Sequence, residues 1–427
     1  MDTETISFRA LRLHDWRQFG SIELLFHERL TVITGANAAG KTTLLDLLAS
    51  HFGWNHQFVG TPARRKRGRP LSFLSGLWRR ASLSDQQTAA EIGGIEYSNG
   101  ETCTLRVPDQ LAGPAFSISY DGQQGVSGMF IPSHRPAFSY TAVNQIPTDL
   151  GGRAEIISRY LDESRARWAG GASSYTPVYR LKEALISMAT FSYGNQVVEE
   201  DRETVELYEG FIATLRQVLP PSLGFSNLTI RNRSEVVLET SSGDFPIDAV
   251  SGGVAAIIDL AFQIYMHDIS RSRFVVVIDE PENHLHPELQ RSLLPGFLEA
   301  FPAAQFIVAT HSPFVVGSVE KSHVHVLRYG PTDPGSEDDR REKVFSTLLD
   351  TVNTAGNSNE ILRDVLGLKA TMPLWAEREL EGLVSRLLEE PLSAETIRRA
   401  REELGRIGLE DALPETVERL VKSDPID

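Results

Sequence analysis

The stretch FVVVIDEPENHLHP, residues 274–287, decides the fold. Its first five residues are apolar and mostly β-branched, which predicts a strand buried on both faces, as in a parallel sheet. Asp279 and Glu280 follow directly, at the carboxyl end of the strand, where open α/β sheets bind their ligands. One carboxylate there is suited to hold Mg²⁺, and the next to polarise a water. The alternative interpretation is a buried strand that ends in an acidic, solvated turn.

A second motif lies near the N-terminus. The apolar residues 30–34 predict a strand, which continues into GANAAGKTT, residues 35–43, and then into an apolar helix. Strand, GxxxxGK[ST] and helix form the context of a phosphate-binding loop, in which backbone N–H groups surround phosphates and the helix N-terminus adds partial positive charge. Lys41 is predicted to contact the phosphates and Thr42 to ligate Mg²⁺.

Composition indicates an ordinary globular protein. The chain has 427 residues, 41% of them hydrophobic and 23% charged, which is enough for two or three domains or one large domain with an insertion. The net charge of −15 argues against non-specific nucleic-acid binding by the whole surface. A single cysteine, Cys103, fits a reducing compartment. With no signal-peptide pattern and no apolar run of the ~18 residues that a membrane helix needs, we expect a cytoplasmic protein without a membrane partner.

A compact basic run, Arg64–Arg69, stands out in this acidic chain, and Arg79 and Arg80 follow closely. Such a run is suited to contact a nucleic-acid backbone or a regulatory anion. A solvated, mobile loop is an equally good interpretation, and the sequence leaves both open.

Alternation and turn residues predict the elements between the two motifs. Apolar alternation predicts an antiparallel pair over 6–13 and 22–26, and Glu91–Val107 reads as a hairpin that turns at Asn99-Gly100. Residues 140–222 are predicted to be mainly helical. Further strands are expected at Phe116–Tyr120, Met129–Ile131, Ser226–Ile230, Glu235–Glu239, Gln305–Thr310 and His323–Leu327.

Two polar positions sit where predicted elements begin or end. Ser251 is a good N-cap for the apolar helix that follows, and Gly252 and Gly253 leave the helix N-terminus open to a second anion. A plain capped helix is the simpler interpretation. His311 stands at the carboxyl end of a predicted core strand, where its ring would face a ligand bound at that edge.

These motifs, Gly35–Thr42, Ser251–Gly253, Asp279-Glu280 and His311, come in the order seen in ABC-type ATPase heads. The chain resembles the branch that includes RecF, the SMC proteins and the OLD-family nucleases. The resemblance covers roughly residues 1–328 and implies an α/β, ABC-type P-loop ATPase head with an antiparallel β lobe and a helical insertion within about 55–247. A linker over 329–342 and a C-terminal helical module over 343–427 are expected to follow.

The resemblance also implies roles for individual residues, with ATP and Mg²⁺ as the ligands. Catalysis is expected from Glu280 as base, with Lys41 and His311, while Thr42 and Asp279 are expected to hold the metal. The implied nucleotide contacts are Arg17, Gly35, Asn37, Ala38, Ala39, Gly40, Lys41, Thr42, Thr43, Ser251, Gly252 and Gly253.

Departures from the family patterns narrow the function. The loop Ser133–Arg135 takes the place of the Q-loop but has no glutamine. The sequence lacks the sustained heptad repeats that would predict the coiled-coil arms of SMC proteins. The segment after Leu327 is too short and too helical for the TOPRIM domain of OLD nucleases. With these features absent, the chain is similar to the stand-alone ATPase subunits of two-gene anti-phage systems such as PARIS and Septu. This implies a homodimer or higher oligomer of heads that sandwich ATP, and a separate effector of the nuclease type. The alternative is a RecF-like DNA-binding ATPase of repair or recombination.

Overall fold

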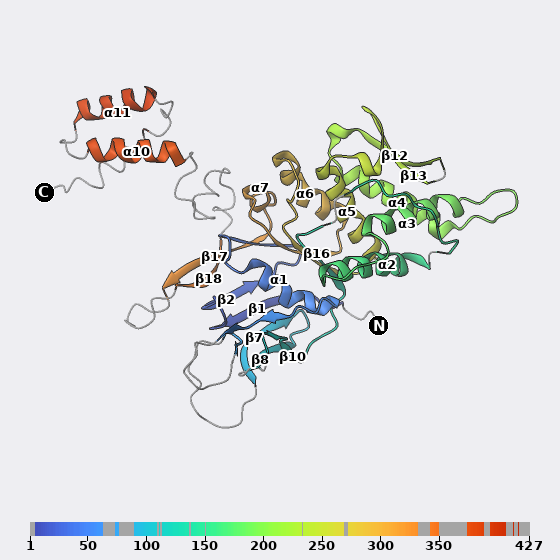
Figure 1. Cartoon of the computed structure of the whole chain (residues 1–427), viewed down its shortest axis with the longest axis horizontal. Coiled ribbons are helices and arrows are strands. Elements are labelled where there is room, and N and C mark those ends of the chain that lie inside the picture. The colour runs from blue at the N-terminus through green and yellow to red at the C-terminus, as the bar shows by residue number, and fades with distance from the viewer. Residues whose placement is uncertain are drawn as a thin grey trace. The chain divides into compact units, whose positions relative to one another are not determined.

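The chain divides into two compact units, Met1–Ile361 and Leu362–Asp427 (Figure 1). The computed structural model describes residues 5–62, 73–76, 89–108, 111, 113–135, 138–149, 151–232, 234–268, 272–331, 342–349, 374–387, 393–406, 413 and 417. The basic run Arg64–Arg69 lies outside the described residues, as does most of the segment 329–342.

A six-stranded sheet forms the centre of the first unit, and five of its strands run parallel. In spatial order they are β11 (Gly128–Ile131), β15 (Phe274–Asp279), β16 (Ala304–Ala309), β3 (Leu30–Gly35) and β17 (His323–Pro331), followed by the antiparallel β18 (Glu342–Leu348). Every residue of β3, β15 and β16 is buried. The structure therefore confirms the buried parallel strand that the apolar run before Asp279 predicts.

A second, antiparallel sheet packs against the central one. Its strands, in spatial order, are β10 (Ser119–Asp121), β8 (Thr102–Pro108), β7 (Ala89–Tyr97), β1 (Phe8–His14) and β2 (Ser21–Leu25). One hydrophobic core joins the two sheets through Leu44 and Leu48 of helix α1 (Lys41–Ala49). The predicted strand pair and the hairpin at Asn99-Gly100 are both confirmed.

The remaining strands are short or peripheral. They are β4 (Phe58–Val59) with β9 (Ala115–Phe116), β5 (Thr61–Pro62) with β6 (Phe73–Leu74), and the three-stranded sheet of β12 (Phe225–Arg231), β13 (Glu235–Thr240) and β14 (Gly243–Pro246).

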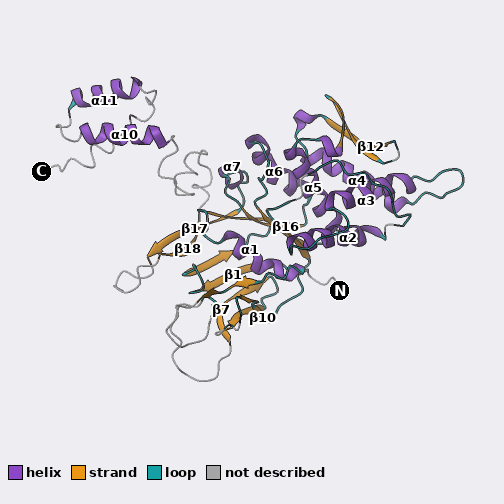
Figure 2. Ribbon diagram, viewed as in Figure 1, coloured by secondary structure: helices purple, strands orange, loops and turns teal. Residues whose placement is uncertain are grey.

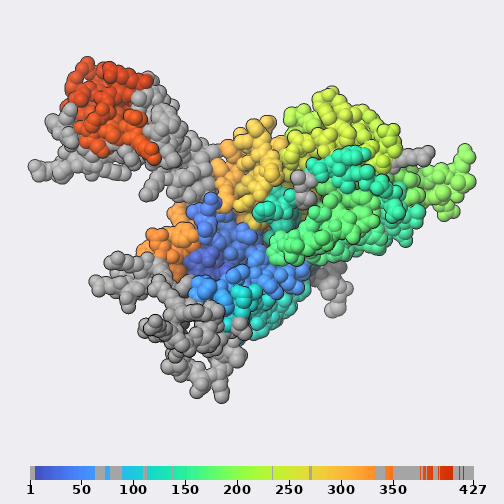
Figure 3. All heavy atoms as spheres, viewed as in Figure 1, coloured from blue at the N-terminus to red at the C-terminus, as the bar shows by residue number. Residues whose placement is uncertain are grey.

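Helices cover one side of the sheets, as Figure 2 shows, and in Figure 3 their side chains pack directly against the N-terminal segments. The longer ones are α2 (Gly152–Trp168), α3 (Pro177–Phe191), α4 (Arg202–Val218), α5 (Gly252–His267) and α6 (Pro287–Ala300). The described residues also form short helices, which are the 3₁₀ helices η1 (Ser50–Phe52), η2 (Pro221–Leu223) and η3 (Ile247–Ala249) and the one-turn helix α7 (Pro313–Val316). Side-chain caps begin α3, α4 and α5, because Thr176, Asp201 and Ser251 each accept a hydrogen bond from a first-turn N–H group.

One predicted assignment was wrong. Residues from Lys343 onward were expected to be helical, but Glu342–Leu348 forms β18, whose Val344 is fully buried and exchanges backbone hydrogen bonds with Gln18 and Gly20. Tertiary pairing with β17 thus overrides the local pattern. The strand expected at Met129–Ile131 is confirmed as β11, which joins the central sheet parallel to β15.

The second unit contains two described helices, α10 (Leu374–Leu387) and α11 (Ala394–Arg406). Their apolar faces meet in a small core that includes Leu380, Leu383, Ala400 and Leu404. The described segments 374–387 and 394–406 are therefore helical, as the sequence predicts.

A buried ion pair fixes the helical layer to the chain that leads into α5. Lys182 of α3 is fully buried, and its Nζ pairs with Asp248 Oδ2 and donates to Thr141 O at 2.6 Å. Asp248 lies three residues before Ser251, and its side chain is only 3% exposed. The pair therefore fixes the position of the segment that begins α5.

Breaking this pair is expected to destabilise the fold strongly. Lys182→Met leaves the Asp248 carboxylate buried without its counter-charge, so the free energy of unfolding should fall by about 3–5 kcal/mol. Urea denaturation followed by circular dichroism measures the change. The matched control is Arg231→Met, whose pair with Asp244 has side chains 46% and 42% exposed. That substitution should cost less than about 1 kcal/mol, and equal losses in the two variants would contradict the assignment.

Candidate nucleotide-binding site

The loop between β3 and α1 has the backbone form of a phosphate-binding loop. Ala38 and Gly40 have positive φ angles of 63° and 96°, and Gly40 is the N-cap of α1. A Cβ at Gly40 would stand 2.5 Å from both Gln18 Nε2 and Phe19 Cζ. Only glycine fits at this position of the tight loop. No side chain caps the N-terminus of α1, so its first N–H groups face the loop without a side-chain acceptor.

Lys41 is buried within this loop. Its Nζ donates to Gly35 O at 3.0 Å and to Ala36 O at 3.2 Å, and it lies 3.3 Å from His311 Nδ1. Burial lowers the pKa of Lys41 to about 8, and the negative charges of Asp279, Glu280 and Glu282 oppose this shift. The ammonium group is held by backbone carbonyls at the position where the sequence predicts a phosphate contact.

Thr42 and Asp279 come together from opposite ends of the sequence. Thr42 Oγ1 donates to Asp279 Oδ2 at 2.9 Å, and burial raises the pKa of Asp279 to about 6. Within the described part of the chain, the buried Asp279 Oδ1 has no hydrogen-bond partner. A hydroxyl and a carboxylate with a spare oxygen are the hard ligands that Mg²⁺ prefers, so these two residues fit the metal that the sequence implies.

Glu280 and His311 face each other beside Lys41. Glu280 Oε1 lies 3.7 Å from His311 Nε2, and Glu280 Oε2 accepts from Asn283 Nδ2 at 3.0 Å. Both side chains are about one third exposed, so water reaches them. The φ of Glu280 is +48°, a strained value for a residue with a Cβ that is typical of functional sites. Burial lowers the pKa of His311, and the charge of Lys41 adds to this effect.

Glu282 positions the loop that carries His311, a role that the sequence did not indicate. Its Oε1 accepts from Thr310 Oγ1 at 2.6 Å, from His311 N at 2.8 Å and from Ser312 N at 3.2 Å. The local sequence offers only a weak signal, a carboxylate three residues after Asp279. The three bonds fix the backbone of the His311 loop relative to the end of β15.

Sequence reasoning placed the loop that contains Arg135 but assigned no role to the arginine itself. The loop at Ser133–Arg135, expected in the Q-loop position, lies beside the end of β15. Arg135 Nη2 donates to Glu280 O at 3.1 Å and to Pro281 O at 3.3 Å, and Nη1 lies 3.5 Å from Asp279 O. Burial lowers the pKa of this guanidinium, which the charge of Asp259 opposes. An arginine therefore holds the backbone of the carboxylate turn where the family pattern has a glutamine.

Arg17 directly precedes Gln18 and Phe19, which stand against Gly40 of the loop, and Ser251 begins α5. Arg17 Nη2 donates to Val59 O at 2.9 Å, and the guanidinium lies over the rings of Trp16 and Phe58. Ser251 is exposed, and its Oγ accepts from Val254 N at 3.5 Å as the cap of α5. A Cβ at Gly253 would stand 3.2 Å from His284 O, so the N-terminus of α5 packs on the turn after Glu280.

Comparison with known proteins agrees with this geometry. Residues 181–317 match the family described as "AAA domain, putative AbiEii toxin, Type IV TA system", and residues 10–69 match one described as "AAA domain". The Retron Vc95 probable ATPase of Vibrio cholerae serotype O1 biovar El Tor is 21% identical, over 89% of this chain and 82% of that protein. Septu protein PtuA of Bacillus thuringiensis is 22% identical, over 86% of each chain.

A solved SMC head domain from Thermotoga maritima covers 80% of this chain and 99% of its own, with 14% identity and a TM-score of 0.42. The order of the motifs and the two-sheet α/β fold resemble those of an ABC-type P-loop ATPase head. The chain is similar to a retron protein described as a probable ATPase and to a Septu protein. In the described residues, no helix has both the length and the apolar character to span a membrane.

The raised pKa of Asp279 predicts that this residue destabilises the nucleotide-free head. A folded-state pKa of about 6, above the unfolded value of 3.8, gives a stabilising contribution that is present below pH 3.8 and lost as pH rises through 6. Asp279→Asn should therefore raise the free energy of unfolding by about 1–3 kcal/mol at pH 8 and change it little at pH 4.

Thermal and urea unfolding at the two pH values measure this effect without nucleotide. Asp121→Asn is the control, since that exposed carboxylate pairs with Arg106 on the surface and should change stability little at either pH. A loss of stability at pH 8 in Asp279→Asn would show that the carboxylate acts as a structural hydrogen-bond partner and contradict the prediction.

Proposed function

We propose that the protein binds and hydrolyses ATP and serves as the ATPase subunit of an anti-phage defence system, in which it controls a separate effector. One observation carries the enzymatic part: Lys41, Thr42, Asp279, Glu280 and His311 converge at the carboxyl edge of the parallel sheet. These residues stand at or just after the carboxyl ends of β15, β16 and β3, which are neighbours in the sheet although β3 is far from the other two in sequence. Their combination suits phosphoryl transfer to water.

Binding of the phosphates falls to the loop and to Lys41. In the proposal, the ammonium exchanges its bonds to Gly35 O and Ala36 O for phosphate oxygens, and the free N–H groups at the start of α1 complete the cradle. Thr42 and Asp279 would hold Mg²⁺, which neutralises phosphate charge when bound. A negative ligand beside Lys41 also favours its charged form, which burial disfavours.

Glu280 is the proposed general base. Its carboxylate is accessible to water and is held by Asn283, so it can orient a water and take its proton, an effect worth about 10²–10⁴ in rate. His311 lies between Glu280 and Lys41, where its ring is placed to donate a hydrogen bond to charge that develops on the transferred group. Glu282 binds the backbone of His311 and Arg135 binds the backbone of Glu280, so both side chains are held in position.

Two heads are proposed to share each nucleotide. The N-terminus of α5 is exposed at Ser251 and Gly252, and it is a different helix terminus from the one that the phosphate-binding loop uses. In ABC-type heads this terminus faces the nucleotide of the other head. We therefore infer a homodimer or higher oligomer in which Ser251, Gly252 and Gly253 complete the site of a second copy.

The defence role and the effector are inferred from the relatives. A retron ATPase and a Septu protein match nearly the whole of this chain, from different organisms. We infer that this head likewise acts with a separate effector, of the nuclease type, and that nucleotide-dependent pairing of heads controls it.

Glu280→Gln is expected to keep ATP binding and to lower the hydrolysis rate by about 10²–10⁴, because the amide cannot take the proton. Fluorescent-nucleotide titration and phosphate release measure the two steps. In a host that carries this chain with its adjacent genes, the same variant should also lose protection in a plaque assay. Glu288→Gln, on the exposed first turn of α6, is the control and should match the parent. Parental hydrolysis by Glu280→Gln would rule out the base assignment.

Ser251→Arg should fold and bind ATP but fail to pair heads, because its long side chain fills the space for the partner's nucleotide. Mixing it with Lys41→Ala protein should recover part of the ATPase activity, since one mixed site has an intact Lys41 and an intact Ser251. The control mixture combines Ser251→Arg with the Ser251→Arg, Lys41→Ala double variant and should stay inactive. If Ser251→Arg alone hydrolyses ATP at the parental rate, the two heads do not share the site.

A further inference from the structure

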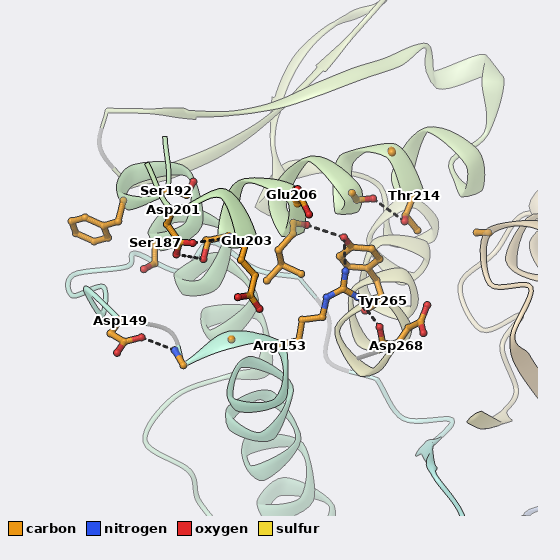
Figure 4. A pocket seen from close by; sticks show the side chains of 18 of the residues that line it. Asp149, Arg153, Ser187, Ser192, Asp201, Glu203, Glu206, Thr214, Tyr265 and Asp268 are labelled. Carbon is orange, nitrogen blue, oxygen red and sulfur yellow. Dashed lines mark hydrogen bonds between the residues drawn. The ribbon is translucent and has the colours of Figure 1, made fainter. Parts of the chain in front are cut away.

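A cavity of about 1020 Å³ opens in the helical layer, away from the motifs of the nucleotide site. The N-terminus of α2, one face of α4 and the C-terminal ends of α5 and α6 form its walls (Figure 4). Phe301–Ala303, just before β16, close one side. Because His311 follows the carboxyl end of β16, this cavity lies at the opposite edge of the sheet from the candidate nucleotide site.

The lining of the cavity is strongly acidic. Its carboxylates are Asp149, Asp201, Glu203, Glu206 and Asp268. Figure 4 shows Asp149 and Glu203 directed toward the cavity from two sides. The single lining guanidinium, Arg153, donates to Tyr265 O and Asp268 O, both at 2.9 Å, and to Tyr265 Oη at 3.0 Å. Its donors are directed to these groups, and the exposed carboxylates of Glu203 and Glu206 on α4 can attract a cation from outside.

An apolar rim adjoins these carboxylates. Phe191 and Val198 line the cavity and are exposed, and between them in sequence lie Tyr193 and Val197, of which Val197 is 91% exposed. Apolar side chains gathered on a surface beside polar ones mark sites of protein interaction. We call the cavity together with Phe191, Val197 and Val198 the acidic groove.

We propose that the acidic groove docks a segment of the effector protein in which Lys or Arg side chains alternate with apolar ones. The proposal rests on the proposed function only for the existence of that effector. Charge complementarity selects the occupant: the carboxylates attract ammonium and guanidinium groups, while they repel nucleic-acid phosphates and anionic lipids. The apolar rim and the volume favour a peptide over a small free cation, because a peptide covers both kinds of surface at once.

A segment bound in the acidic groove would also contact α5, the helix that Ser251 caps. Tyr265 lines the groove near the C-terminal end of α5, and its hydroxyl donates to Leu207 O of α4 at 3.0 Å. Ser251 caps the other end of the same helix. A docked segment would therefore touch the element on which the proposed pairing of heads depends.

The test uses a labelled peptide of two Lys-Leu-Ser-Arg-Val-Ser repeats as the probe, with fluorescence anisotropy on the full chain at physiological ionic strength. One comparison peptide has Ser for Leu and Val, and another has Glu for Lys and Arg. We expect the first peptide to bind and the other two to bind at least about tenfold more weakly, a difference of the size that a few interface contacts supply.

The protein variants locate the binding. Glu203→Gln with Glu206→Gln, and separately Phe191→Ser with Val198→Ser, should each weaken binding by about tenfold. All four positions are exposed, so the variants are expected to fold. The matched control is Glu91→Gln with Glu101→Gln, which changes the charge equally at exposed positions of β7 and of the turn before β8, and should stay within twofold of the parent.

Three outcomes overturn the proposal. No binding of the probe peptide below about 1 mM would show that the groove has no affinity for such a segment. Equal weakening in the groove and control variants would assign the binding to the net charge of −15 alone. A smaller assembly in sedimentation of the groove variants without peptide would assign the groove to contact between copies. Hydrolysis is measured separately: a parent protein without ATPase activity refutes the proposed function and leaves the peptide result standing.

Discussion

The hydrogen bond from Thr42 to Asp279 is the contact on which the candidate site depends. It joins the first turn of α1 to the end of β15, although β16 lies between β15 and β3 in the sheet. The bond spans 237 residues of sequence, so it forms only when the central sheet is assembled in its full strand order. Burial at this position is unfavourable for the carboxylate, which is why its pKa rises. The surrounding charges are arranged around that constraint: Lys41 opposes the shift, and Glu280 adds to it.

The turn after Asp279 is held from two sides by groups outside the expected motifs. Arg135 binds its carbonyls from the β11 side, and Glu282, which belongs to the turn itself, binds the N–H groups of the His311 loop. These bonds keep Glu280 in a left-handed backbone conformation and His311 beside it. Strained conformations persist when surrounding structure over-determines them, and the two residues supply that constraint. The geometry of the candidate site therefore depends on backbone contacts as much as on the side chains that the motifs name.

The sequence predicts the parts of this structure that local patterns determine. The loop before Lys41 needs glycine at Gly40, the strand before Asp279 is uniformly apolar, and Ser251 is a good cap, so each of these elements could be assigned without coordinates. Strand partners could not be. Gly128–Ile131 is only four residues long, and nothing in it distinguishes a parallel neighbour from an antiparallel one.

The same limit explains the residues that sequence reasoning missed. Arg135 and Glu280 are 145 positions apart, and Val344 reaches the core only by pairing with a strand that precedes it. Local propensity contains no information about such contacts, so the loop that contains Arg135 could be placed but the hydrogen bonds of the arginine could not. Arg17 is a similar case: the family pattern implies a phosphate contact, and the hydrogen bond from its Nη2 to Val59 O of β4 could not be predicted from the sequence.

The burial of Lys41 and Asp279 also bears on the lifetime of the protein in a cell. Both pKa shifts show that the empty head keeps charges in surroundings that disfavour them. Any ligand that binds only the folded head raises its stability in proportion to the logarithm of ligand concentration over the dissociation constant. A nucleotide that binds as proposed would thus stabilise the folded head against unfolding. If ATP binds as proposed, a lower nucleotide concentration would expose a larger unfolded fraction to proteases and so lower the abundance of the protein.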